Sequence, residues 1–210
     1  GGVFSVPFCT FIRAQLGAGV IKVELPETGD DSRQFGPLLN GVSGYFASLN
    51  RGKESICLDL KAYADREIFE ALLESADVMV ENFRPHVMDR LGYGWEVLHA
   101  RYPRLIYGSI SGFGKQNVDN SEPAYDIIIQ ALSGIMSLTG KGKGDYNRVG
   151  VSIADLSSGL FLTIGILASL HKLQTTGQGE IIDIAMLDSV LSLMEYPVMR
   201  YSTSGVSPGP

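Results

Sequence analysis

The sequence predicts an α/β fold with a mostly parallel sheet, and two observations lead to this prediction. Short runs rich in β-branched residues alternate along the chain with longer segments of helical periodicity, and charged residues or glycine bound the runs. Strands that alternate with crossover helices form parallel sheets covered on both faces. Such sheets bind ligands beyond the carboxyl ends of their strands, so the loops that follow the strands are the candidate site.

The first half of the chain supplies three of the predicted strands. A helix over residues 8–16 is expected to end at Gly17, because glycine commonly follows the last helical turn. Residues 20–24 (VIKVE) follow as a strand, and a glycine- and asparagine-rich loop comes next. A strand–helix–strand unit is then predicted over 55–60 (SICLDL), 62–75 and 77–80 (DVMV).

The second half continues the alternation and ends in helices. Short helices are expected over 85–91 and 95–100, then a strand over 105–110 (LIYGSI) and a helix over 125–138. Long apolar helices are predicted over 156–174 and 184–199, before a tail of loop composition over 202–210. The last helix and the tail lead out of the domain, so we expect the chain to be part of a longer protein.

The composition is that of a protein with a packed core. The 210 residues include 45% hydrophobic residues, and 17 basic against 23 acidic groups give a net charge of −6. An acidic balance argues against a nucleic-acid binder, which needs a basic surface. The uncharged run 156–170 is too short to span a bilayer, so we expect no membrane segment. No N-x-S/T sequon points to secretion, and we expect a cytoplasmic protein, or a mitochondrial one in a eukaryote.

Several familiar motifs fail a physical test. Residues 205–209 spell a nucleophile elbow, but a proline-containing tail supplies neither the strand nor the helix that this motif needs. The lysine–glycine run 140–144 lacks phosphate-loop spacing and is expected to be a mobile surface turn. Cys9 and Cys57 stand in apolar surroundings and are expected to be buried. The histidines lack metal-ligand spacing, so we expect no metal site.

Basic and amide side chains stand in loops at the ends of predicted strands, at 50–53, Lys61, 82–85 and Arg90. Phe83 stands between Asn82 and Arg84 directly after a buried strand. An aromatic ring beside a guanidinium is suited to stacking on a base and binding phosphate. The alternative is that these are solvated loop residues, and the spacing alone leaves both interpretations open.

Asp155 immediately precedes the long apolar helix predicted over 156–174. Its default role is to cap that helix. The alternative is a nucleophile, because a helix N-terminus stabilises a carboxylate and the small residues at 157–159 let a bulky ligand approach. Both roles are open from the residues alone.

A series of stretches spans nearly the whole chain in order. It comprises residues 16–24, 49–61, 76–85 (ADVMVENFRP), 103–114 (PRLIYGSISGFG), 130–134, Asp155, and 176–179 with Asp183. With this series the chain resembles the class III CoA-transferases, the family of formyl-CoA:oxalate and carnitine CoA-transferases. The family also includes the 2-methylacyl-CoA racemases.

The resemblance implies a Rossmann-like CoA-binding large domain over 1–182. Residues 183–210 would then form a helix and tail that lead toward a second domain absent from this chain. The chain would be an incomplete fragment of a homodimer whose two chains interlock. The implied substrates are an acyl-CoA thioester and a small carboxylic acid, with no prosthetic group.

The resemblance also assigns roles to residues. Asp155 matches the family's nucleophile, which attacks the thioester to form an acyl-aspartyl anhydride. The CoA thiolate then returns to give an aspartyl-CoA thioester, from which the acceptor carboxylate takes over the CoA. The positions that match the family's CoA contacts are Leu58, Lys61, Asn82, Phe83, Arg84, Arg90 and Tyr125, with Pro123 nearby.

Two other functions are compatible with the same scaffold, a 2-methylacyl-CoA racemase and a non-catalytic CoA-binding relative. The racemases place a histidine before the aspartate that opens the helix matching 126–138, as one half of an acid/base pair. Here that position is Tyr125. A phenol, with an ordinary pKa near 10, is a poor base at neutral pH. We therefore favour transfer over racemisation.

Overall fold

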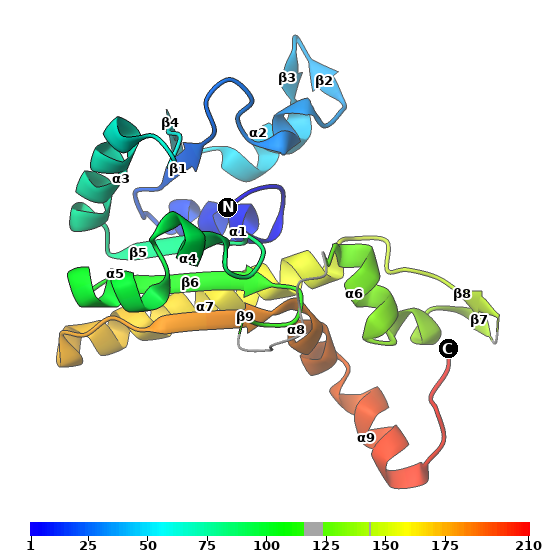
Figure 1. Ribbon diagram of the computed structural model, residues 1–210. Coiled ribbons are helices and arrows are strands. Elements are labelled where there is room, and N and C mark those ends of the chain that lie inside the picture. The colour runs from blue at the N-terminus through cyan, green and yellow to red at the C-terminus, as the bar shows by residue number, and fades with distance from the viewer. Residues whose placement is uncertain (116–123, 143) are drawn as a thin grey trace.

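Two parallel sheets form the framework of the computed structural model, which describes residues 1–115, 124–142 and 144–210. Strands β5 (Val78–Glu81), β6 (Ile106–Ser111) and β9 (Ile181–Ala185) pair in the order β5-β6-β9 (Figure 1). Strands β1 (Ile21–Glu24) and β4 (Glu54–Cys57) form a separate parallel pair. The predicted α/β class with parallel pairing is confirmed.

The three-stranded sheet lies between two layers of helices, and each face has its own apolar core. All six residues of the central strand β6 are buried. Ile110 packs into the core formed with α1 (Ser5–Gln15), α7 (Ile153–Thr176) and α8 (Met186–Leu193). Tyr107 packs into the core formed with α3 (Tyr63–Ser75), α4 (Val87–Leu91) and α5 (Trp95–Arg101). A strand buried on both faces is typical of parallel sheets, and it explains the continuous apolar run in the sequence.

Helix α7 crosses behind this sheet, close to its backbone (Figure 1). A Cβ added at Gly108 of β6 would lie 2.8 Å from the side chain of Leu162 of α7, so a larger residue would require that side chain to shift. α7 runs beyond the expected 156–174, and by length and composition it is the one helix of the described residues that is able to cross a membrane. Within its most apolar window 44% of the residues are buried inside the protein. Packing against β6 and β9 is the position of a core helix.

The segment between β1 and β4 contains structure where the sequence predicts a loop. It holds a 3₁₀ turn (Asp31–Gln34), the antiparallel pair β2 (Leu38–Leu39) and β3 (Val42–Ser43), and helix α2 (Gly44–Asn50). Ser43 caps α2, since its Oγ accepts a hydrogen bond from the amide of Phe46 at 3.0 Å. The loop prediction is wrong here because elements this short have little periodicity.

The C-terminal region also differs from the prediction. The expected helix 184–199 is instead the strand β9 followed by α8 and α9 (Glu195–Ser204). Pro197 explains the break, because its ring clashes with a carbonyl four residues earlier and is tolerated only in the first turn of α9. α9 also takes up the first residues of the expected tail.

Three smaller predictions also need correction. The helix expected over 125–138 is α6 (Asp126–Leu132) followed by a 3₁₀ turn (Ile135–Leu138). The expected surface turn contains strand β7 (Gly140–Gly142), which pairs with β8 (Asp145–Tyr146). Cys9 is buried as predicted, but Cys57 is exposed, because β4 has a single neighbour, β1, among the described strands.

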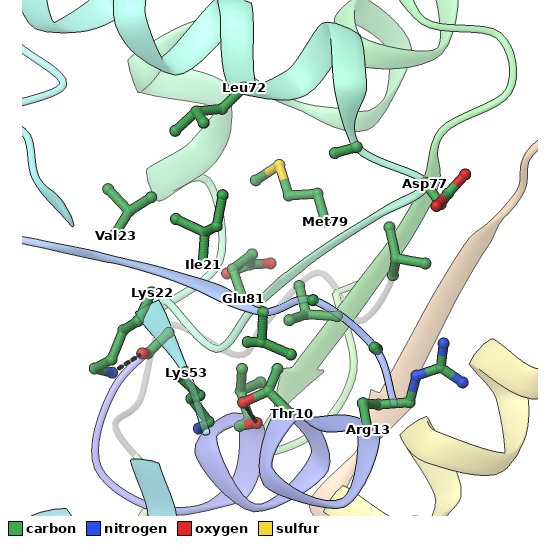
Figure 2. A pocket seen from close by; sticks show the side chains of 18 of the residues that line it. Thr10, Arg13, Ile21, Lys22, Val23, Lys53, Leu72, Asp77, Met79 and Glu81 are labelled. Carbon is green, nitrogen blue, oxygen red and sulfur yellow. Dashed lines mark hydrogen bonds between the residues drawn. The ribbon is translucent and has the colours of Figure 1, made fainter. Parts of the chain in front are cut away.

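A cavity of about 640 Å³ lies between strands β1 and β5. Figure 2 shows apolar side chains, among them Ile21 and Met79, toward one side of it, and Lys22 and Lys53 toward the other. Asp155 does not line this cavity. The cavity therefore does not extend to the carboxyl group described next, although Lys22, Glu81 and Phe83, which are also described below, line it.

Candidate functional site

Asp155 lies within the first turn of α7. The helix begins at Ile153, and Ser152, which precedes it, makes no side-chain capping hydrogen bond. Of the two roles that the residues left open, Asp155 therefore does not have that of the N-cap, because the helix starts before the apolar run that indicated its beginning. The amide of Ala154 is satisfied from another helix instead, since it donates to Oδ1 of Asp126 at 2.8 Å.

The surroundings of Asp155 favour its protonated form. Burial, and secondly the carboxylate of Asp126, raise the pKa of Asp155 to about 7, while hydrogen bonding from Ser5 acts in the opposite direction. Tyr45 of α2 shares this environment, because burial, Asp155 and Asp30 together raise its pKa to about 12. A carboxyl group that titrates near neutral pH in a partly buried site is a functional-site candidate.

Asn82 connects the end of β5 to this site. Its Oδ1 accepts from the amide of Gly2 at 2.8 Å, and its Nδ2 donates to the carbonyl of Gly2 at 2.9 Å. The same Nδ2 lies 3.3 Å from Oγ of Ser5, the residue that hydrogen-bonds Asp155. The side chain of Asn82 therefore holds the N-terminal turn against the sheet.

A buried ion pair holds the other side of that turn. Lys22 Nζ lies 2.6 Å from Oδ2 of Asp30, and the two side chains are 7% and 2% exposed. Oδ1 of Asp30 accepts from the amide and hydroxyl of Ser32 at 2.9 and 2.6 Å, and it lies 3.4 Å from the amide of Val3. Burial would raise the pKa of Asp30, but the hydrogen bonds from Lys22 and Ser32 hold it at about 2. The ionised pair is thus fully partnered.

A second polar cluster lies at the ends of β5 and β6. Glu81, which is 1% exposed, accepts hydrogen bonds from Tyr107 at 3.0 Å and from Lys115. Its other oxygen accepts from the amide of Phe83 at 2.7 Å. The first residues of the loop after β5 are therefore fixed to the sheet, while the side chain of Phe83 is 41% exposed.

The residues predicted to bind CoA fall into three groups. Leu58 is buried, and Asn82 is engaged within the chain as described. Lys61, Phe83, Arg84 and Arg90 are exposed on loops after β4 and β5 and on α4. The side chains of these three cations make no hydrogen bond or ion pair with another described residue. Tyr125, 71% exposed, precedes α6 beside Asp126, and Pro123 lies outside the described residues.

Ser5, Tyr45 and Asp126 belong to the site, but sequence reasoning does not identify them. Asp126 carries one local signal, an acidic residue at the start of a predicted helix. Ser5 and Tyr45 carry none, because they meet Asp155 only through the packing of α1 and α2. No group of three or more potential metal ligands is arranged to hold an ion among residues 1–115, 124–142 and 144–210.

Parallel sheets with a half-buried carboxyl group in the first turn of a core helix, and exposed cations on the loops after the strands, define an α/β protein with a carboxyl centre. The family model of CoA-transferase family III matches residues 1–210. The chain belongs to this family.

Relatives and solved structures agree with this assignment. The chain is 47% identical over 207 residues to the acetyl-CoA:oxalate CoA-transferase of Acetobacter aceti, a match over 98% of this chain and 53% of the relative. It is 42% identical over 215 residues to the succinyl-CoA:mesaconate CoA-transferase of Haloarcula hispanica, over 98% and 54%. A CAIB/BAIF family protein from Brucella suis superposes with a TM-score of 0.94 at 38% identity, over 100% of this chain and 56% of that one. The chain thus spans about half the length of the relatives it matches.

Proposed function

We propose that the protein transfers CoA from an acyl-CoA thioester to a carboxylic acid acceptor, with Asp155 as the covalent nucleophile. The observation that carries the proposal is the position of Asp155, half-buried in the first turn of α7 in a chain whose relatives are named CoA-transferases. The ionised fraction of such a group attacks as a carboxylate that has lost much of its water shell.

The proposed steps balance in bonds and charge. A carboxylate oxygen of Asp155 attacks the thioester carbonyl, and the CoA thiolate leaves, which gives a mixed anhydride. The thiolate then attacks the aspartyl carbonyl and expels the donor acid, which leaves an aspartyl-CoA thioester. The acceptor carboxylate repeats these two steps in reverse, so that CoA leaves on the acceptor and Asp155 is restored.

Trapping the anhydride or thioester tests this proposal. Full-length protein is incubated with an acyl-CoA and then with hydroxylamine, and the peptide that contains Asp155 is analysed by mass spectrometry. Because the attacking species is the anion and the pKa of Asp155 is raised to about 7, adduct formation should increase with pH and reach half its maximum near pH 7. A hydroxamate on another residue, or none, would contradict the proposal.

We propose further that Lys61, Arg84 and Arg90 bind the phosphates of CoA and that Phe83 lies near the adenine. The support is the exposure of these side chains on the loops after β4 and β5 and on α4, and the anchoring of the Phe83 amide by Glu81. Guanidinium and ammonium groups pair with phosphate through charge-assisted hydrogen bonds.

Removing one of these charges should weaken CoA binding. Arg84→Gln, Arg90→Gln and Lys61→Gln are each expected to raise the Kd for CoA by roughly three- to tenfold and to reduce its salt dependence, as measured by calorimetry at two salt concentrations. Lys172→Gln is the matched control, because it makes the same charge change on the C-terminal part of α7, where Lys172 pairs with Glu180. Equal affinities for CoA in all four variants would contradict the proposal that Lys61, Arg84 and Arg90 bind its phosphates.

A further inference from the structure

The start of α7 is held by two side chains of a different helix, α6. Gln130, which is fully buried, accepts from the amide of Val149 through Oε1 at 2.8 Å and donates from Nε2 to the carbonyl of Val151 at 3.2 Å. Asp126 accepts from the amide of Ala154 at 2.8 Å. Three backbone groups just before and within the first turn of α7 are thus fixed from one neighbouring helix.

Asp126 of α6 accepts a hydrogen bond from the first turn of α7, as an N-cap side chain does for the helix that it precedes. The first amides of a helix have no partner inside the helix, and Ser152 supplies none to α7. Oδ1 of Asp126 fills that gap, while its Oδ2 accepts from Nε2 of Gln130 at 2.7 Å. The carboxylate of Asp126 is therefore held by hydrogen bonds on both oxygens, and one of its donors is the amide of Ala154, the residue directly before Asp155.

We propose that Asp126 is a positioning residue for Asp155, which caps α7 from the neighbouring helix and sets the pH range in which Asp155 attacks. The inference rests on the function proposed above for Asp155. A negative charge fixed beside a nucleophilic carboxylate disfavours its ionisation, and the effect is strong where both groups are partly shielded from water.

The other groups around Asp155 do not explain its behaviour. Hydrogen bonding from Ser5 of α1 lowers its pKa, and Tyr45 of α2 faces it as a neutral phenol. Burial and Asp126 are the two causes that raise the pKa of Asp155. In the described part of the chain, the remaining charged or titratable groups on elements packed against α7 add no shift; they are Cys9, Arg13, Tyr107, Asp183 and Asp188.

The variant Asp126→Asn separates charge from capping. Asparagine keeps an oxygen that accepts from the Ala154 amide but carries no charge, so the pH midpoint of hydroxamate formation on Asp155 should move to lower pH. The rate of hydroxamate formation at pH 5.5 divided by the rate at pH 8 should be about threefold or more higher in this variant than in the wild type. Asp126→Glu, which keeps the charge, should retain a midpoint near that of the wild type.

Gln130→Met is the matched control. It removes hydrogen bonds from the same segment without a change of charge, so it should lower the rate or the stability with the midpoint unchanged. If Asp126→Asn does not fold, the neutral but cap-competent Asp126→Ser replaces it. A midpoint that stays in place in the neutral variants, with adduct still forming, would overturn the inference.

Failure of the inference is distinguishable from failure of the proposed function. If the wild type forms no adduct on Asp155, the proposed function is wrong. The pKa of Asp155 is then measured directly in full-length protein by ¹³C NMR of labelled aspartate, and an equal pKa in wild type and Asp126→Asn would overturn the inference on its own.

Discussion

Asp155→Asn is expected to abolish CoA transfer while it stabilises the protein. An amide does not attack a thioester as a carboxylate does, so the rate should fall on the order of 10⁴-fold or more, as when other covalent nucleophiles are removed. CoA binding should remain, because the proposed phosphate contacts lie on other elements. Transfer is measured by mass spectrometry of the product CoA ester, and a wild-type rate would refute the covalent role.

The stability effect follows from the raised pKa of Asp155. Below pH 4 the side chain is protonated in both the folded and the unfolded state and carries no penalty. Between pH 4 and 7 the folded state holds a proton that the unfolded state releases, so stability falls as pH rises, and above pH 7 the penalty is constant. After a discount for partial exposure, Asp155→Asn should unfold with a free energy roughly 1–2 kcal/mol higher at pH 8. Urea titrations should show this gain shrinking toward zero at pH 4.

Lys22→Met is expected to be the most destabilising single change in the part of the molecule that holds the N-terminal turn. It leaves Asp30 charged and buried at 2% side-chain exposure without its cation. Loss of one partner of a buried ion pair costs about 3–5 kcal/mol. Urea unfolding of full-length protein at pH 7 measures this cost.

Two further variants test the cause. Lys22→Met combined with Asp30→Asn should recover much of the loss, because asparagine still accepts from the amides of Ser32 and Val3 without a buried charge. Lys172→Met removes an exposed partner of Glu180 and should cost less than about 1 kcal/mol. If Lys22→Met costs no more than this surface change, the ion pair does not hold the turn.

The sequence predicts the centre of the sheet better than its margins. β6 is a continuous run of apolar and small residues because both of its faces are covered. Such a run can be recognised in the sequence without knowledge of the strands beside it. β9 is not recognised because Asp183 interrupts its run and Met186 begins a helical pattern directly after it. Exposed Cys57 shows the same limit, since residue type alone does not reveal that β4 lies at an edge.

The site could be predicted only in part, for a related reason. Asp155 is found because it lies beside a long apolar helix, which is a strong local signal. The position of that helix's first turn depends on Asp126 and Gln130, which are brought to it by packing of α6 against α7. A contact made between distant segments leaves no periodicity in the sequence, so Ser5, Tyr45 and Asp126 emerge only from the fold.

The placement of Asn82 joins the surroundings of Asp155 to the loop proposed to bind CoA. The side chain of Asn82 hydrogen-bonds the turn that carries Ser5, the hydrogen-bonding partner of Asp155. The residues that follow Asn82 in the chain are Phe83 and Arg84. A movement of that loop on nucleotide binding would therefore pull on the environment of the nucleophile. Coupling between two equilibria is reciprocal. If CoA binding changed the ionisation constant of Asp155 by some factor, ionisation of Asp155 would change the affinity for CoA by that same factor. The side chain of Asn82 would thus couple CoA binding to the ionisation of Asp155, if both proposed roles hold.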